Sequence, residues 1–215
     1  MQEQKGKGDY WGRFAGTYDD TIDRMMGKEV RLRLADVLAR EHGLGEAVEF
    51  GCGTGYFTRV IARNAKHVTA TDISPLMIDV ARSKLKSYDN VTLLVQNSES
   101  TTLPADAYDT ALMANMLHTL DDPVKALKEC RRVLKPGGTL LIINYTEEGM
   151  SRVERTLLFF RFALRFGFPP RKNWPITSEK LRSFLDEAGF RIERMDLING
   201  RLNALYVRAK KNRPQ

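Results

Sequence analysis

Nine residues, 48–56 (VEFGCGTGY), constrain the fold of this chain more than any other segment. Their three glycines, Gly51, Gly53 and Gly55, lie between a short apolar run at residues 47–50 and a helical pattern. Glycine adopts turn conformations that are closed to other residues, and it lets a ligand come close to the backbone. A glycine-rich turn between a strand and a helix is the context that a nucleotide-binding loop requires. We therefore expect a ligand-binding loop here.

Strand-like and helix-like patterns alternate on both sides of this loop. Ser74-Pro75 and Asp122-Pro123 each combine a helix N-cap with a proline in the first turn. Alternation of this kind predicts βαβ units and a parallel sheet. The expected strands are 47–50, 68–71, 91–95, 110–114 and 139–144, and the expected helices are 28–42, 57–64, 75–85 and 123–134. Lys135–Gly138 (KPGG) is expected to be a turn.

The pattern changes after residue 145. A longer connection contains a helical stretch at 156–166, and a further helix is expected at 178–189. Two strand-like runs, 191–198 and 201–209, flank Asn199-Gly200, which is the strongest short-range signal for a β-hairpin. An antiparallel hairpin at the end of a parallel sheet is not needed by a simple doubly wound dinucleotide-binding fold.

Composition limits the classes to which the chain can belong. With 215 residues, 42% of them hydrophobic and 28% charged, we expect one globular domain. We find neither a signal peptide nor an apolar run long enough to span a bilayer, so we expect a cytoplasmic protein. Cys52 and Cys130 are too few for a disulfide framework or a zinc site, and we expect reduced thiols and no metal. The net charge of +7 favours anionic partners only in a general way.

Asp72 adds the second element of a binding site. It follows Gly51 by about 20 residues and ends the next expected strand, where an acidic residue accepts hydrogen bonds from ribose hydroxyls. The glycine loop places backbone N–H groups and a helix N-terminus beneath the same ligand. Together these features predict an adenosine-containing ligand. The alternative interpretation is a structural turn and a solvated acid.

Four motifs together resemble the class I S-adenosylmethionine-dependent methyltransferases. They are Glu49-x-Gly51-x-Gly53-x-Gly55, Asp72-Ile73-Ser74, Asn115-x-x-His118 and Val133–Gly138 (VLKPGG). The resemblance covers roughly residues 44–145, and it is strongest to the small-molecule type (methyltransferase domain 11), related to ubiquinone and menaquinone C-methyltransferases. It implies an α/β fold with a Rossmann-like, seven-stranded, mostly parallel sheet. A C-terminal antiparallel hairpin, helices on both faces and an N-terminal helical lid complete the expected fold.

The resemblance also implies a division of the single domain into four parts. Residues 1–43 would form the N-terminal lid and helix, and residues 44–145 the cofactor-binding core. Residues 146–177 would be a cap insertion on the substrate side, and residues 178–215 the C-terminal helix and hairpin.

The resemblance implies S-adenosylmethionine as the cofactor and S-adenosylhomocysteine as the product. The acid before the loop and the loop glycines would hold the methionine moiety, and the acid after the second strand would bind the ribose. A side chain after the third strand departs from the family, which usually has an acid beside the adenine amino group where this chain has Asn97. The implied cofactor-binding residues are Tyr18, Glu49, Gly51, Gly53, Gly55, Asp72, Ile73, Asn97, Ser98 and Asn115.

Transfer of a methyl group from a sulfonium needs little covalent help from a protein. Catalysis would come from in-line positioning and from the exclusion of water. A general base is needed only if the nucleophile must lose a proton. His118 is the first candidate for that base, although a histidine at this place in the family is often a packing residue. Tyr145, Glu147 and Glu148 are weaker candidates.

The acceptor is expected to be a small and, in one interpretation, apolar molecule. We do not expect a nucleic-acid substrate, because the Asn-Pro-Pro-aromatic motif of amino-group nucleic-acid methyltransferases is missing. Residues 156–166 are strongly apolar apart from Arg161 and Arg165, which suits a packed cap, a substrate lid or a peripheral membrane contact. Three alternatives stay open: a methyltransferase acting on RNA or protein, a nicotinamide-dependent oxidoreductase, and a non-catalytic module that binds S-adenosylmethionine.

Overall fold

The structure is a computed structural model that describes residues 11–166 and 175–212, apart from the side chains of Phe162, Arg165 and Phe166. The first ten residues of the expected N-terminal lid therefore lie outside the described residues. So do residues 167–174 of the expected cap and residues 213–215 of the tail.

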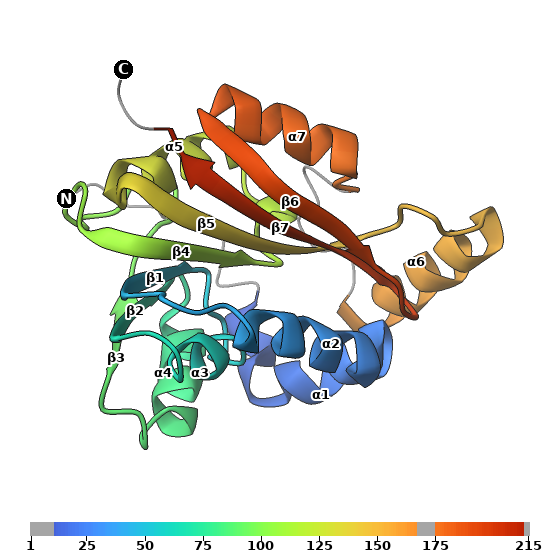
Figure 1. Cartoon of the computed structure of the whole chain (residues 1–215). Helices are drawn as coiled ribbons and strands as arrows, with labels where there is room; N and C mark the ends of the chain where they lie inside the picture. The colour runs from blue at the N-terminus through green and yellow to red at the C-terminus, as the bar shows by residue number, and fades with distance from the viewer. Residues whose placement is uncertain (1–10, 167–174, 213–215) are drawn as a thin grey trace.

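A seven-stranded sheet with the strand order β3-β2-β1-β4-β5-β7-β6 forms the centre of the molecule (Figure 1). Strands β1 to β5 pair in parallel, and β7 runs antiparallel to both of its neighbours, β5 and β6. The expected sheet, with its antiparallel C-terminal hairpin, is therefore confirmed. The strands are β1 (Glu46–Phe50), β2 (His67–Asp72), β3 (Val91–Val95), β4 (Tyr108–Ala114), β5 (Leu134–Thr146), β6 (Phe190–Ile198) and β7 (Asn203–Lys211).

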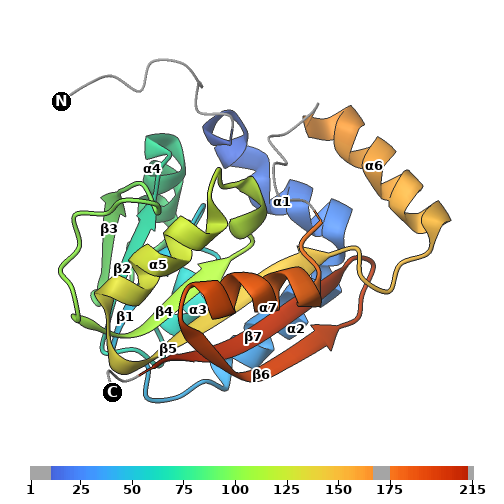
Figure 2. The same ribbon diagram turned by 90° about the horizontal axis from the view of Figure 1, so that it is seen from above.

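Helices cover both faces of this sheet, as expected (Figures 1 and 2). The side chains of β5 show the division: Leu140 and Ile142 pack with α5 and α7, whereas Leu141 and Ile143 pack with α2, α3 and the N-terminal helices. The helical segments are η1 (Gly12–Thr17), α1 (Tyr18–Ile22), η2 (Asp23–Gly27), α2 (Lys28–Ala39), α3 (Thr58–Ile61), α4 (Pro75–Lys84), η3 (Leu117–Thr119), α5 (Pro123–Val133), α6 (Arg152–Phe166) and α7 (Ser178–Glu187).

The cap signals in the sequence place the starts of α4 and α5 correctly. The Ser74 hydroxyl accepts a hydrogen bond from the Met77 N–H (3.1 Å), and the Asp122 carboxylate accepts one from the Lys125 N–H (2.9 Å). Each cap is followed by a proline at the first helical position. These bonds satisfy backbone donors that have no partner within the helix.

The Lys135–Gly138 turn lies within β5. Tyr108 pairs with Leu134, but Thr110, only two residues further on, pairs with Thr139. The additional residues form a bulge in the ladder, so β5 begins five residues earlier than expected, at Leu134 instead of residue 139.

The connection between β6 and β7 differs from the expected two-residue turn. Ile198 ends β6 and Asn203 begins β7, so four residues, 199–202, join the strands. Neither Asn199 nor Gly200 has a positive φ, which a type I′ turn requires at both central positions. Gly200 is needed for space instead, since a Cβ there would lie 2.4 Å from Val30 Cγ2 of α2.

Candidate active site

A cavity of about 700 Å³ opens at the carboxyl ends of the parallel strands, against the N-terminal helices. Parallel α/β sheets bind ligands at this edge because the loops that follow the strands converge there. Nine of the ten implied cofactor-binding residues line the cavity, and so does His118. The nine are Tyr18, Glu49, Gly51, Gly53, Asp72, Ile73, Asn97, Ser98 and Asn115.

The glycine loop after β1 is held against the end of β2. The N–H of Cys52 donates to the Thr71 carbonyl (2.8 Å), and the N–H of Gly53 donates to Asp72 Oδ2 (2.8 Å). Gly51 and Gly53 have φ values of +69° and +53°, in the left-handed region that favours glycine. Two amides of the loop are therefore used to fix its shape.

Gly55 has a different role from the other two loop glycines. It does not line the cavity, and a Cβ at this position would lie 2.7 Å from Leu85 Cδ1. Its missing side chain lets α4 and the residues after it pack against the loop. A packing role of this kind is known for the third glycine of nucleotide-binding loops.

Asp72 connects the loops that follow β1 and β2. Its Oδ2 accepts from the Gly53 N–H, and its Oδ1 accepts from the Ser74 N–H (2.9 Å). Asp72 also lines the cavity, where its carboxylate would face the hydroxyls of a ribose. The same residue therefore shapes the loop and faces the cavity.

Glu49 is an acid enclosed at the base of the cavity, with 1% of its surface exposed. Its Oε2 accepts a 2.6 Å hydrogen bond from the Thr58 hydroxyl, and its other oxygen has no donor among the described residues. Burial raises the pKa of the Glu49 carboxyl to about 7. A cation in the cavity would hold this carboxyl in its ionised form, because the opposite charge favours that form.

The three residues expected to contact the adenine all line the cavity. Ile73 is largely exposed and Ser98 is nearly buried, and both line the cavity. The side-chain carbonyl oxygen of Asn97 accepts a 2.9 Å hydrogen bond from the Glu99 N–H, which closes a local turn, because asparagine readily bonds the backbone two residues on. An amide oxygen can accept a second hydrogen bond, so the contact of Asn97 with an adenine amino group stays a prediction.

Asn115 holds the ends of β4 and β5 together. Its N–H donates to the Ile143 carbonyl (2.7 Å), and its Oδ1 accepts from the Tyr145 N–H (2.9 Å). Its φ of +56° lies in the left-handed region, which asparagine tolerates better than most residues. Unusual backbone conformations of this kind cluster at ligand sites.

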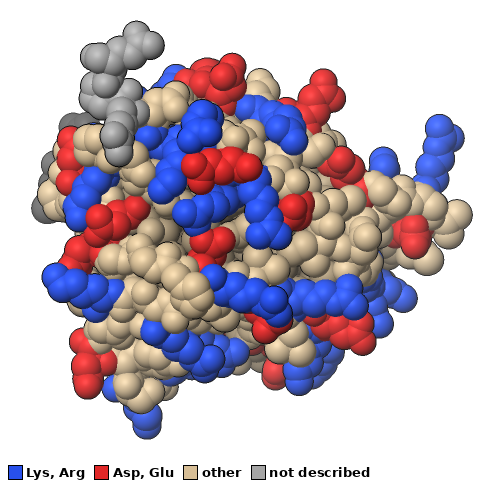
Figure 3. Space-filling view, viewed as in Figure 1, with Lys and Arg blue, Asp and Glu red and all other residues tan. Residues whose placement is uncertain are grey.

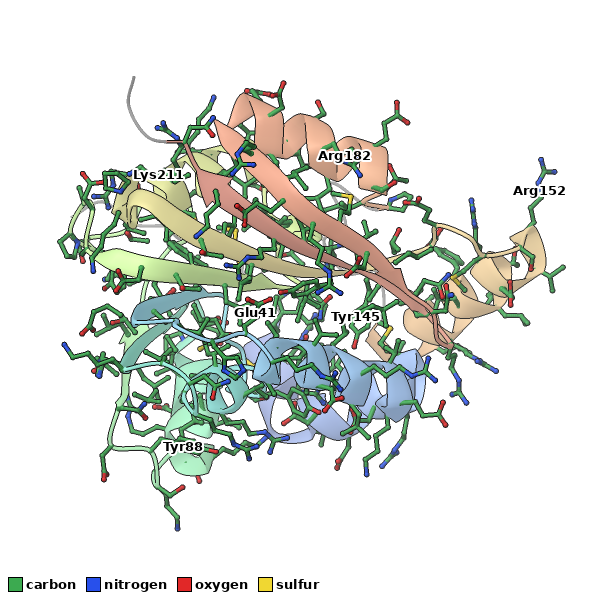
Figure 4. All side chains as sticks on the ribbon, in the orientation of Figure 1. Glu41, Tyr88, Tyr145, Arg152, Arg182 and Lys211 are labelled. Carbon is green, nitrogen blue, oxygen red and sulfur yellow. The ribbon has the colours of Figure 1, made fainter. Side chains whose placement is uncertain are left out.

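His118 and Tyr145 line the cavity together with Asn115. His118 belongs to the short helix η3, and Tyr145 stands near the end of β5 and points toward the N-terminal helices (Figure 4). The Tyr145 hydroxyl is buried without a hydrogen-bond partner among the described residues, and this burial raises the pKa of the phenol. Neither Glu147 nor Glu148 lines the cavity. Glu148 instead accepts from the N–H and the hydroxyl of Ser178.

The N-terminal helices form one wall of the cavity through Trp11, Tyr18, Ile22 and Met26. Tyr18 is half-buried, and desolvation of its hydroxyl raises the pKa to about 12, so the phenol stays protonated.

A charged network ties these helices to the glycine loop. Asp19 accepts hydrogen bonds from the Thr54 hydroxyl (2.9 Å), from Arg31 and from Lys84. These partners come from the loop after β1, from α2 and from α4. Asp19 thus joins the N-terminal helices to the glycine loop.

Arg31 is a site residue that we did not expect from the sequence. It lines the cavity, is 4% exposed, pairs with Asp19 and Asp23, and places its guanidinium 3.5 Å from the centre of the Tyr56 ring. The sequence does contain one indication that Arg31 is buried. Arg31 precedes Leu34 by three residues and Leu38 by seven, which places a charge on the apolar face of α2.

The described residues contain no group of three or more His, Cys, Asp or Glu side chains arranged to hold a metal ion. Both cysteines are free and buried, and burial raises the pKa of each thiol. Within residues 11–166 and 175–212, no helix combines the length and apolar character needed to cross a bilayer.

Comparison with known proteins identifies the central segment. Residues 48–142 match the model of the family described as "Methyltransferase domain". A demethylmenaquinone methyltransferase of Tropheryma whipplei is 34% identical over 125 residues, which cover 58% of this chain and 50% of that protein. A malonyl-acyl-carrier-protein O-methyltransferase of Serratia marcescens is 34% identical over 131 residues, covering 61% and 49% respectively. The chain thus spans about half the length of the curated relatives it matches.

Among solved structures, an S-adenosylmethionine-dependent methyltransferase from Aquifex aeolicus superposes with a TM-score of 0.69. The two chains are 22% identical, and the match covers 93% of this chain and 98% of that one. At this identity the likeness shows a shared fold. The expected Rossmann-like methyltransferase fold is confirmed by it.

Proposed function

We propose that this chain, which carries a class I S-adenosylmethionine-dependent methyltransferase domain at residues 48–142, transfers a methyl group to a small molecule. One observation supports this proposal above the others. Glu49, the glycine loop and Asp72 face a single cavity at the strand edge where α/β folds bind their ligands. The volume of this cavity, about 700 Å³, lies in the range of small-molecule sites.

The residues present suit the chemical groups of S-adenosylmethionine. The buried Glu49 carboxylate offers a charge to the methionine ammonium, and Asp72 offers two acceptor oxygens to the ribose. Gly53 has no side chain, and nothing lies within 4 Å of the point where a Cβ would be. A ligand could therefore approach the backbone of the loop at this position. Ile73 and Ser98 would flank the adenine at the rim.

When bound, S-adenosylmethionine supplies a methyl group that its sulfonium already activates. The protein would then position the acceptor for in-line displacement and exclude water. Asn115, His118 and Tyr145 line the wall where the acceptor would lie. If the acceptor must lose a proton, His118 is the candidate base, and the Tyr145 hydroxyl is a candidate donor to an acceptor oxygen.

The four-part division of the chain remains part of this proposal. The N-terminal segment would close the methionine end, and residues 146–177 would select the acceptor. The wall formed by Ile22 and Met26 is apolar, which suits an acceptor with an apolar body. The names of the two relatives refer to different acceptors, a quinone and an acyl-carrier protein. The acceptor class of this chain is therefore to be identified by experiment.

Titration calorimetry with S-adenosylmethionine tests the site. We expect Asp72→Ala to raise the Kd at least tenfold, because both ribose acceptors are lost. Asp79→Ala is the matched control, since Asp79 is a solvent-exposed acid on α4 that pairs only with Arg82 among the residues described. Circular dichroism shows whether the Asp72→Ala protein is folded. Unchanged affinity in a folded Asp72→Ala protein would refute the site assignment.

A screen for acceptors tests the activity. Pooled metabolites, including the lipid fraction, are incubated with protein and S-adenosylmethionine and searched for a mass gain of one methyl group. Methyl incorporation into total RNA or protein, with none into metabolites, would favour the macromolecular alternative. The face shown in Figure 3 does not support the macromolecular alternative, because Lys and Arg are interleaved with Asp and Glu there. Binding without formation of S-adenosylhomocysteine in any fraction would favour a non-catalytic module.

A further inference from the structure

Helix α6 (Arg152–Phe166) projects from the layered body of the protein. Figures 1 and 2 show it at the periphery, beyond the carboxyl ends of the central strands and beside the N-terminal helices. Among its described side chains, only Leu158 is buried, and it packs in the cluster that contains Met25 and Met26 of η2. The helix is therefore attached through Leu158, and its other described side chains are exposed or partly exposed.

The exposed surface of α6 carries one continuous apolar stripe. Val153, Leu157, Phe160 and Leu164 are spaced by four, three and four residues, which places them on a single helical face. Their exposed fractions are 68%, 52%, 57% and 88%. Soluble proteins seldom expose a stripe of large apolar side chains, and where one occurs it marks a contact surface.

Arginines flank this stripe. At 3.6 residues per turn, Arg161 and Arg152 lie on opposite sides of the stripe, about 70° and about 110° from its centre. Both are exposed, and neither forms an ion pair with a described carboxylate. Arg152 points away from the body of the protein (Figure 4). The single acid of the helix, Glu154, accepts a hydrogen bond from the Ser151 N–H at the start of the helix.

We propose that α6 seats the protein on an anionic lipid bilayer. The apolar stripe would enter the boundary between headgroups and acyl chains, and Arg152 and Arg161 would lie at the lipid phosphates. An amphipathic helix with arginines beside its apolar face binds membranes in this way, because apolar burial and charge attraction add. The convex, projecting shape of the helix fits a plane, and the +7 charge of the chain favours an anionic one.

The position of α6 gives this contact a consequence for the site. The helix packs on η2, and Met26 of η2 lines the cavity, as does the adjacent Ile22. A bilayer at α6 would therefore lie beside the apolar wall of the cavity, where a lipid-dissolved acceptor could enter. The membrane contact itself does not depend on the proposed methyl transfer, and its test needs no substrate.

Cosedimentation of the full chain with sucrose-loaded vesicles tests the proposal. We expect binding to vesicles of phosphatidylglycerol and phosphatidylcholine in equal parts and much weaker binding to phosphatidylcholine alone. Phe160→Ser combined with Leu164→Ser should lower the partition coefficient at least tenfold. Leu32→Ser on α2 is the matched control, because Leu32 is 51% exposed but lies on a different helix, and it should leave the partition unchanged.

The charge contribution is tested separately. Arg152→Gln with Arg161→Gln should weaken binding to the anionic vesicles severalfold and leave the weak binding to phosphatidylcholine unaltered. Circular dichroism shows whether each variant is folded.

Three results would overturn the proposal. The wild-type protein could stay in the supernatant with anionic vesicles, or Leu32→Ser could lose as much binding as Phe160→Ser with Leu164→Ser. The third result is that the apolar stripe joins two copies of the chain. The last is detected by sedimentation velocity without lipid, as a dimer that Phe160→Ser with Leu164→Ser dissociates.

Discussion

Replacing Glu49 by glutamine should stabilise the ligand-free protein above neutral pH. Burial raises the pKa of the Glu49 carboxyl from 4.5 to about 7, so the folded protein favours the protonated acid. Relative to the unfolded chain, this preference stabilises the fold fully below the unfolded pKa and is lost as the pH rises through the folded pKa. A shift of about 2.5 units at about 1.4 kcal/mol per unit means that the ionised side chain costs about 3 kcal/mol above about pH 7.

Glutamine removes this cost without removing the hydrogen bond. Its side-chain oxygen can still accept from the Thr58 hydroxyl, which lies 2.6 Å from Glu49 Oε2. Urea unfolding without ligand should therefore show Glu49→Gln more stable than wild type by on the order of 3 kcal/mol at about pH 8. At about pH 5 the gain should be only about 1 kcal/mol, because most of the buried acid is then protonated.

Glu46→Gln is the control on the same strand. A hydrogen bond from Lys66 (2.9 Å) lowers the pKa of the Glu46 carboxyl, so its charge is favourable and its removal should bring no gain at either pH. The reasoning fails if Glu49→Gln gains nothing at about pH 8, or if it gains equally at about pH 5 and about pH 8.

The same ionisation should control binding. In the proposed site the ammonium of the methionine moiety would pair with the ionised Glu49 carboxylate, so calorimetry should show wild-type affinity for S-adenosylmethionine decreasing as the pH falls below about 7. Glu49→Gln should bind more weakly at about pH 8 and should lose this part of the pH dependence. A variant that is stabilised and yet binds as tightly as wild type would show that Glu49 does not face the cofactor.

Two further predictions concern contacts between distant segments. Asp19→Asn removes the charge that joins the N-terminal helices to Thr54 of the glycine loop (2.9 Å), so S-adenosylmethionine should dissociate at least several times faster in stopped-flow displacement. An unchanged dissociation rate would show that this segment does not close the site. Gly200→Ala places a Cβ 2.4 Å from Val30 Cγ2 and should destabilise the fold by about 1–3 kcal/mol in urea unfolding. Val30→Ala should relieve part of that loss, whereas Gly16→Ala, which has nothing within 4 Å, should have little effect; equal losses in the two alanine variants would contradict the packing argument.

The sequence alone determined the local conformations and the edge of the sheet where the site lies. Ser74 and Asp122 carry their cap signals within four residues of the N–H groups they bind, so short-range pattern is sufficient to place α4 and α5. The glycine loop and Asp72 each follow a strand, and in a parallel sheet such positions meet at one edge. The strand-like runs on both sides of Asn199-Gly200 predicted the antiparallel C-terminal hairpin, the family resemblance implied it as well, and the structure confirms it.

Only the tertiary structure decided which of these residues face the cavity and which pack. Gly55 makes room for Leu85, and Gly200 makes room for Val30, which is far away in the sequence. The sequence suggested a hairpin turn at Gly200 because turn propensity is local, whereas the contact with α2 that requires glycine is not.

Burial decided the electrostatics in the same way. Nothing adjacent to Glu49 in the sequence raises its pKa to about 7, and nothing adjacent to Arg31 supplies its partners Asp19 and Asp23. Local propensity acts through a residue's nearest neighbours in the chain. Desolvation and ion pairing depend on segments that meet only after folding. For that reason the sequence could locate the glycine loop, whereas the tertiary structure determined the pKa of Glu49 and the ion pairs that join the N-terminal helices to the loop.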